Sequence, residues 1–208
     1  MILCNQCLFI HIPKCAGTSV RSVILGSGLD CLLLTRVNDP SGNLREDPNQ
    51  FNPHASPASL LRSLGESILK ELLAFTFVRN PWERYVSWWS WRNDSRTFEQ
   101  FLRELIDPRH SKTDASPRLP GNPPEQQAYF SKPDLYRYIG QVERMNDCWH
   151  DLRQLLIRRG FRTDKLPNTL PVTNTSDHDD YRTYYTDDLV ELVARREPFV
   201  IDRFGYQF

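Results

Sequence analysis

Residues 8–20, LFIHIPKCAGTSV, begin with five residues of strand type and end in a segment typical of a helix. At such a joint the N–H groups of the first helical turn lack partners within the helix, so they can bind an anion. Gly17 lets the backbone approach the anion closely, and Thr18 and Ser19 offer hydroxyl groups. Lys14 adds a positive charge on a long, flexible stem. The joint therefore predicts a site for a phosphorylated ligand.

The spacing of this joint differs from that of a Walker A loop. The pattern GxxxxGK[ST] places its lysine directly before the hydroxyl residue, whereas Lys14 precedes Gly17 by three residues. A nucleoside triphosphate with magnesium is therefore the weaker expectation. A plain strand-to-helix turn with a surface lysine remains the structural alternative.

A second joint, in FTFVRNPWERYVS, repeats the same order of strand, basic residue and helix. Asn80 is the expected N-cap, and Pro81 suits the first helical position. Arg79 ends the strand as a rigid fork suited to phosphate, and Ser87 lies about two turns into the helix. Ligands of α/β sheets bind beyond the carboxyl ends of the strands, so we expect both joints to face one crevice. Two separate phosphate sites are what a bisphosphorylated nucleotide requires.

Aromatic side chains recur along the helix that follows Asn80. Trp82, Tyr85, Val86 and Trp89 have the spacing of one helix face and predict a core stripe rather than platforms for a base. Ser87 falls off that stripe.

Strands alternate with helices along the chain. This order predicts one α/β domain over residues 1–208, a P-loop-type, three-layer arrangement with a mainly parallel central sheet flanked by helices. Strands are expected at 8–12, 31–36, 73–78 and 136–142, and helices at 18–27, 57–72, 97–106, 147–159 and 187–196. Residues 38–57 predict a functional loop, and residues 107–124 a mobile surface segment.

The charge balance and the hydropathy of the chain limit which partners it can bind and where it is located. Lys plus Arg and Asp plus Glu number 26 each, so no overall field attracts nucleic acid or an anionic membrane. Apolar runs are too short for a membrane span, and no secretory signal is visible, which predicts a cytoplasmic location.

Five cysteines predict reduced thiols. Cys4 and Cys7 form a CxxC that lacks the second pair needed for zinc, so they are interpreted as ordinary thiols.

IPKCAGTS and FTFVRNPWERYVS resemble the 5′-phosphosulfate loop and the 3′-phosphate motif of sulfotransferases that use 3′-phosphoadenosine 5′-phosphosulfate (PAPS). The resemblance is to carbohydrate sulfotransferases of the heparan sulfate 2-O-sulfotransferase type. IGQVERMND and the segment from residue 174 onward are similar to further parts of that family. Relatives in the secretory pathway carry a membrane anchor, so a Golgi location applies only if this sequence is a piece of a longer protein.

The resemblance implies roles for individual residues. The 5′-phosphate and sulfonate are bound by the loop, and Lys14 also neutralises the bridging oxygen as its bond to sulfur breaks. The 3′-phosphate is bound by Arg79 and Ser87, and His54 in QFNPHASPASLL is the catalytic base. The product is adenosine 3′,5′-bisphosphate (PAP), and no metal is required. The residues that form the loop are Lys14, Cys15, Ala16, Gly17, Thr18 and Ser19.

Cys15 is a departure from the family, because threonine is frequent there in relatives. A backbone N–H survives this change, so binding is expected to survive too, while a thiol near the sulfonate makes the site oxidisable.

The implied reaction is in-line transfer of a sulfonate to a hydroxyl of a carbohydrate. A histidine suits removal of the hydroxyl proton, and geometry must decide which one acts. The alternatives open are a nucleotide-dependent phosphotransferase that uses ATP and magnesium, and a nucleotide-binding module without turnover. The rival candidates for the base are His11, His110, His150, His178, Glu83 and Asp39. Weak site candidates, more often turn-forming, are Asn174, Thr175 and Ser176.

Overall fold

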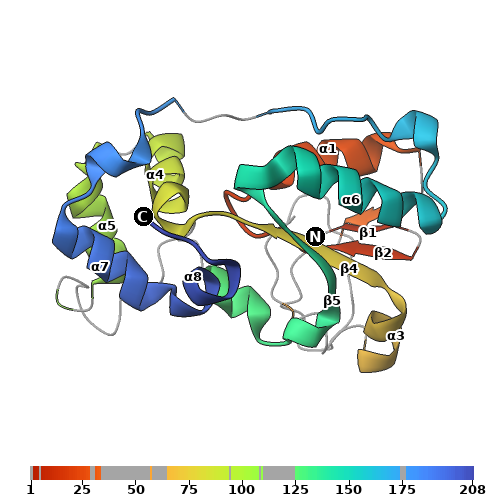
Figure 1. Ribbon diagram of the computed structural model, residues 1–208, viewed down its shortest axis with the longest axis horizontal. Helices are drawn as coiled ribbons and strands as arrows, with labels where there is room; N and C mark the ends of the chain where they lie inside the picture. The colour runs from red at the N-terminus through yellow and green to blue at the C-terminus, as the bar shows by residue number, and fades with distance from the viewer. Residues whose placement is uncertain are drawn as a thin grey trace. The chain divides into compact units, whose positions relative to one another are not determined.

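The computed structural model describes residues 2–4, 6–28, 31–33, 57, 65–93, 95–107, 109, 125–173 and 177–208 (Figure 1). The chain divides into two compact units, which are described separately below. Unit 1 comprises Met1–Val78 and Tyr129–Asn174, and unit 2 comprises Arg79–Ala128 and Thr175–Phe208. The expectation of a single domain over residues 1–208 stays a prediction.

Unit 1 contains a five-stranded sheet among the described residues, in the order β3-β1-β2-β4-β5. Strand β4 lies parallel to both β2 and β5, whereas β1 is antiparallel to both of its neighbours. Because β1 alone is reversed, the other four of these five strands run in the same direction, so the sheet is mainly parallel, as predicted. The strands are β1 (Ile2–Cys4), β2 (Cys7–Phe9), β3 (Cys31–Leu33), β4 (Leu73–Val78) and β5 (Tyr136–Gln141).

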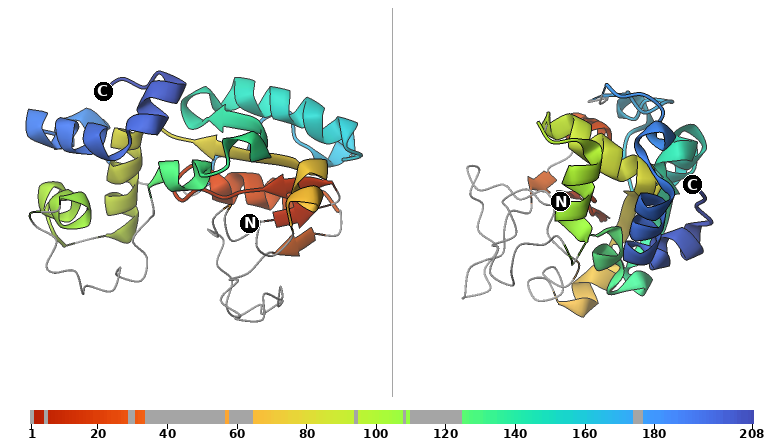
Figure 2. Two further views of the ribbon diagram at one scale, coloured as in Figure 1. Left: turned by 90° about the horizontal axis from the view of Figure 1, so that it is seen from below. Right: turned by 90° about the vertical axis from the view of Figure 1, so that its left-hand side faces the viewer.

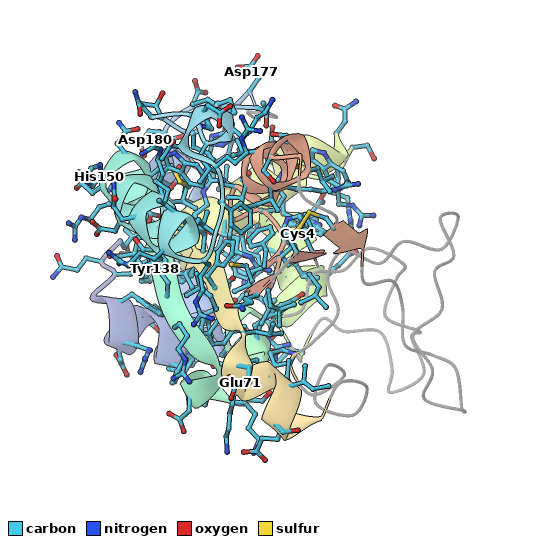
Figure 3. The ribbon with its side chains drawn as sticks, turned by 90° about the vertical axis from the view of Figure 1, so that its right-hand side faces the viewer. Cys4, Glu71, Tyr138, His150, Asp177 and Asp180 are labelled. Atoms are coloured by element: carbon cyan, nitrogen blue, oxygen red, sulfur yellow. A yellow bond between two sulfur atoms is a disulfide. The ribbon has the colours of Figure 1, made fainter. Side chains whose placement is uncertain are left out.

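Helices cover the sheet of unit 1. Helices α1 (Gly17–Gly26) and α6 (Met145–Arg158) lie on the same face, and α3 (Glu66–Glu71) precedes β4 (Figures 1 and 3). Every residue of β4 is buried, as expected of a parallel strand in the middle of a sheet. Helix α6 buries Trp149, Leu152 and Leu156, which share one helix face.

Several boundaries differ from the sequence prediction. The predicted strand at residues 8–12 is only β2, and β1, which pairs with it, was not predicted because three residues are too few to show a period. Strand β5 ends at residue 141, and α1 begins at Gly17. Strand β3 is described over Cys31–Leu33, and residues 34–36 of the predicted strand lie outside the described residues. Of the predicted helix at 57–72, the structure describes residue 57 and 65–72, where α3 lies. The predicted loop at 38–57, apart from residue 57, and most of the segment 107–124 lie outside the described residues.

The prediction that all five cysteines are reduced was wrong. Cys4 and Cys31 form a disulfide, whose sulfur atoms are drawn in yellow in Figure 3. The reason is strand pairing, because Cys4 of β1 lies directly opposite Cys31 of β3. Cys7, Cys15 and Cys148 are free, and burial raises the pKa of the Cys7 thiol to about 12. Spacing along the sequence could not reveal this pairing, since it depends on the unpredicted strand β1.

Unit 2 is helical, with helices α4 (Pro81–Arg92), α5 (Phe98–Ile106), α7 (Asp187–Arg196) and α8 (Pro198–Phe204). Helix α4 begins as predicted, with the Asn80 side chain accepting from the N–H of Trp82 at 3.0 Å. The indole of Trp82 in turn donates to the Val190 carbonyl of α7 at 3.1 Å. In the left view of Figure 2, blue α7 lies across one end of yellow-green α4.

Helix α4 is buried on more than the predicted stripe. Trp82, Tyr85 and Val86 are buried as expected, and Trp89 is half-buried, but Arg84, Ser87 and Trp88 are buried as well. Helix α4 thus encloses two polar residues, and their burial is favourable only if their polar groups have partners. Within the described parts of the chain, no helix is both long and apolar enough to cross a bilayer.

Candidate functional site

The loop between β2 and α1 has an uncommon backbone. Lys14 and Ala16 have φ angles of 65° and 55°, in the left-handed region that residues other than glycine rarely adopt. Ala16 is also the N-cap of α1, and it makes no side-chain capping bond. No acidic side chain lies in the first turn of α1. The dipole of α1 makes this N-terminus favourable for a negative charge.

The side chains of this loop differ in how accessible they are. Lys14 is half-exposed and Thr18 is exposed, so both can reach a ligand. Ser19 is buried; its hydroxyl accepts from the Thr173 N–H at 3.2 Å and lies 2.8 Å from the Thr173 hydroxyl. The Ser19 proton is free for a ligand only when the Thr173 hydroxyl donates this second bond.

Cys15 contacts the loop itself. Its N–H donates to the Ile12 carbonyl at 3.3 Å, and its buried thiol lies 3.6 Å from the Pro13 carbonyl. Both groups stabilise the turn that brings Lys14 and Ala16 into their left-handed conformations. The assignment of Cys15 to the donor site stays a prediction.

Gly17 is required by the imidazole of His11. A Cβ built on Gly17 would lie 1.7 Å from His11 Nε2, far inside any possible contact. His11 is half-buried and its ring stacks on Phe9, with centroids 5.7 Å apart. The sequence predicted that His11 lies within a strand at residues 8–12, but His11 follows the end of β2 and lies against the loop. The sequence could have indicated this position of His11, because apolar and polar residues alternate at 10–12. In the structure Ile10 and Ile12, on either side of His11, are both fully buried.

Arg79, the first residue of unit 2, is held at both its backbone and its side chain. Its guanidinium pairs with Glu83, with Nη2 2.8 Å from Oε1, and 16% of the side chain is exposed. Its N–H donates to Gln126 Oε1 at 3.0 Å, and its carbonyl accepts from Gln126 Nε2 at 2.9 Å. Sequence reasoning missed Gln126, since a single glutamine outside any motif carries no recognisable pattern.

Ser87 lies on α4 in the same unit and is 2% exposed. A buried hydroxyl needs a hydrogen-bond partner, and it can serve a phosphate only where the ligand reaches it. The assignment of Arg79 and Ser87 to one phosphate stays a prediction. So does the expectation that this joint and the loop of unit 1 face one crevice.

The candidates for a catalytic base are only partly described. His54, His110 and Asp39 fall outside the described residues, as do Asn174, Thr175 and Ser176. Of the others, His150 is exposed and points away from the sheet in Figure 3. His178 Nδ1 lies 2.8 Å from the Asp179 carbonyl, and the Glu83 carboxylate is paired with Arg79. Among the described histidines, His11 is the one that lies against Gly17, in the loop between β2 and α1.

Comparison with known proteins gives one family and one fold. The model of the sulfotransferase family matches residues 4–198. Among solved structures, mouse sulfotransferase SULT7A1 complexed with PAP is similar, with a TM-score of 0.53 and 13% identity. This likeness covers 92% of this chain and 84% of that one and confirms the predicted α/β fold class. No curated protein sequence matches the chain.

Proposed function

The chain belongs to the sulfotransferase family, and from this premise we propose that it transfers a sulfonate from PAPS to a hydroxyl group of a carbohydrate. The observation that carries the proposal is the loop before α1. Two left-handed residues, Lys14 and Ala16, lead into a helix N-terminus without a side-chain cap. Such a backbone is suited to phosphate and sulfonate oxygens.

The residues present fit the donor at its 5′ end. Lys14 and Thr18 are accessible, and the loop supplies backbone N–H groups from Gly17 onward. The imidazole of His11 packs on Gly17 and fixes how the loop enters α1. We assign the 5′-phosphate and the sulfonate to this loop, whose residues are Lys14, Cys15, Ala16, Gly17, Thr18 and Ser19.

Arg79 and Ser87 are proposed to bind the 3′-phosphate. The pair with Glu83 does not prevent this, because a guanidinium has five N–H donors and Glu83 accepts from one of its nitrogens. Glu83 also restricts the directions that the fork can take. A phosphate then meets a cation that is already oriented, which reduces the entropy lost on binding.

The donor supplies an activated sulfonate whose leaving group is a phosphate. Lys14 and the N–H groups of the first turn of α1 would bind the oxygens on which negative charge grows. Donors that are in place before the reaction stabilise this charge more than the ground state, and so raise the rate. His54 is proposed to take the proton of the acceptor hydroxyl, for which the pKa of a histidine is appropriate.

A transfer assay with sulfur-labelled PAPS and a panel of saccharides tests this proposal. We expect Lys14→Ala to lower kcat/KM by about 100- to 1,000-fold, because it removes charge stabilisation in the transition state. His54→Ala should lower kcat by about 100-fold or more, with donor binding retained. Exposed Lys132 of the same unit provides the matched control, Lys132→Ala, which should transfer normally.

Two results would count against this account. Transfer by Lys14→Ala at the rate of the unmodified protein would remove the loop from the chemistry. Phosphoryl transfer from ATP that depends on magnesium would favour the phosphotransferase alternative.

A further inference from the structure

We propose that Gln126 is a positioning residue for the 3′-phosphate site, acting through the backbone of Arg79. The inference rests on the proposed function, because it takes Arg79 as the residue that binds this phosphate. Gln126 itself is fully buried and is assigned no contact with the nucleotide.

The contact between Gln126 and Arg79 is made at two points. Arg79 lies between the end of β4 and the N-cap Asn80, outside both the strand and the helix. Its N–H and carbonyl need partners there, and the amide of Gln126 supplies both at 3.0 Å and 2.9 Å. The Gln126 amide thus makes the two hydrogen bonds with the Arg79 backbone that a neighbouring strand would make within a sheet. Together the two bonds fix the peptide groups on either side of the Arg79 Cα.

Gln126 is in turn fixed by the buried core of unit 2. Its N–H donates to Glu197 Oε1 at 3.1 Å, and Glu197 is 0% exposed. The same oxygen accepts from Arg84 Nη1 at 3.2 Å and from the Tyr85 hydroxyl at 3.4 Å. A continuous set of hydrogen bonds therefore leads from a buried ion pair to the Arg79 backbone.

The consequence concerns the direction of one side chain. With its backbone fixed, Arg79 projects its guanidinium toward Glu83 in a defined orientation. Without the Gln126 amide, the backbone at Arg79 can rotate. The guanidinium then no longer donates two parallel hydrogen bonds to a phosphate. The effect should fall on the phosphate that Arg79 binds and leave the rest of the nucleotide unaffected. A merely structural role of Gln126 would not discriminate in this way.

The test compares two nucleotides that differ only in the 3′-phosphate. Adenosine 3′,5′-bisphosphate and adenosine 5′-monophosphate are titrated calorimetrically into the full chain and into Gln126→Ala. We expect the unmodified protein to prefer the bisphosphate by about 100-fold, and Gln126→Ala to reduce this preference by about tenfold. The affinity for the monophosphate should not change. Gln126→Met, which keeps the side-chain volume, should give the same selective loss if the alanine variant does not fold.

Gln127 provides the matched control. Its N–H also donates to Glu197, but its side chain donates to Glu125 at 2.6 Å instead of to Arg79. Gln127→Ala should therefore keep the full preference for the bisphosphate. Adding Gln126→Ala to Arg79→Ala should not lower the affinity for the bisphosphate any further, because Gln126 acts only through Arg79.

The outcomes separate this inference from the function on which it rests. Equal loss of affinity for both nucleotides in Gln126→Ala and Gln126→Met would overturn the positioning role, and so would an unchanged preference. A further loss in the double variant would show that Gln126 acts without Arg79 and would overturn it as well. An unmodified protein that binds the two nucleotides equally would overturn the assignment of Arg79, and with it the proposed donor.

Discussion

The Gly17→Ala protein is expected to lose sulfonate transfer by about 100-fold or more. Its new Cβ would lie 1.7 Å from Nε2 of His11, so either the imidazole or the start of α1 must move. A shift of about 1 Å at a site that orients reacting groups costs about this much in rate. Donor binding should weaken as well, since the first turn of α1 supplies the N–H groups proposed to bind the 5′-phosphate.

Gly26, at the other end of α1, is the matched control. A Cβ on Gly26 meets nothing within 4 Å, so Gly26→Ala should be active and no less stable. The double variant His11→Ala/Gly17→Ala removes the clash and should regain the activity of His11→Ala alone. If Gly17→Ala binds and transfers normally, or if the double variant stays far below His11→Ala, contact with His11 is not the reason for the glycine.

The Glu197→Gln protein is expected to lose about 3–5 kcal/mol of its free energy of unfolding. Glu197 and Arg84 are 0% and 1% exposed, and their ion pair lies at 3.2 Å. Burial raises the pKa of Glu197, against the effects of the Arg84 guanidinium and of the backbone N–H groups of Gln126 and Gln127. Replacing the carboxylate removes the negative charge that pairs with the buried Arg84 guanidinium, while the guanidinium stays buried. Urea unfolding followed by circular dichroism measures the change.

Glu191 on α7 provides the comparison for this prediction. It pairs with Arg195 in the exposed i,i+4 arrangement, with side chains 73% and 63% exposed. Surface pairs of this kind contribute little, so Glu191→Gln should unfold at nearly the same urea concentration as the unmodified protein. Replacing both Arg84 and Glu197 by apolar residues should recover part of the lost stability. A Glu197→Gln protein as stable as the Glu191→Gln control would show that the buried pair is not needed.

The two strand-to-helix joints, before α1 and before α4, could be predicted from the sequence because they depend on interactions between residues close together in the chain. Asn80 caps α4 and Pro81 occupies its first position, as side-chain chemistry at a helix start requires. Strand β4 was predicted at residues 73–78, and all six of its residues are buried. Helix α7 runs over residues 187–196 as predicted, with acidic residues in its first turn.

What sequence reasoning missed depends on contacts between distant residues. Strand β1 is only three residues long, and the disulfide of Cys4 follows from its pairing with β3. Gln126 contacts a residue 47 positions away, and no periodic pattern marks such a contact. The packing of His11 on Gly17 needs the curvature of the loop, which the left-handed Lys14 and Ala16 produce.

Calorimetric titration shows whether the protein has a donor site for a 3′-phosphorylated adenosine nucleotide. The unmodified protein is titrated with adenosine 3′,5′-bisphosphate and, separately, with ATP and magnesium, and both titrations are repeated on Arg79→Ala. We expect the bisphosphate to bind at least about tenfold more tightly than ATP, and Arg79→Ala to remove this difference. Tighter binding of ATP, or no binding of the bisphosphate, would contradict this expectation.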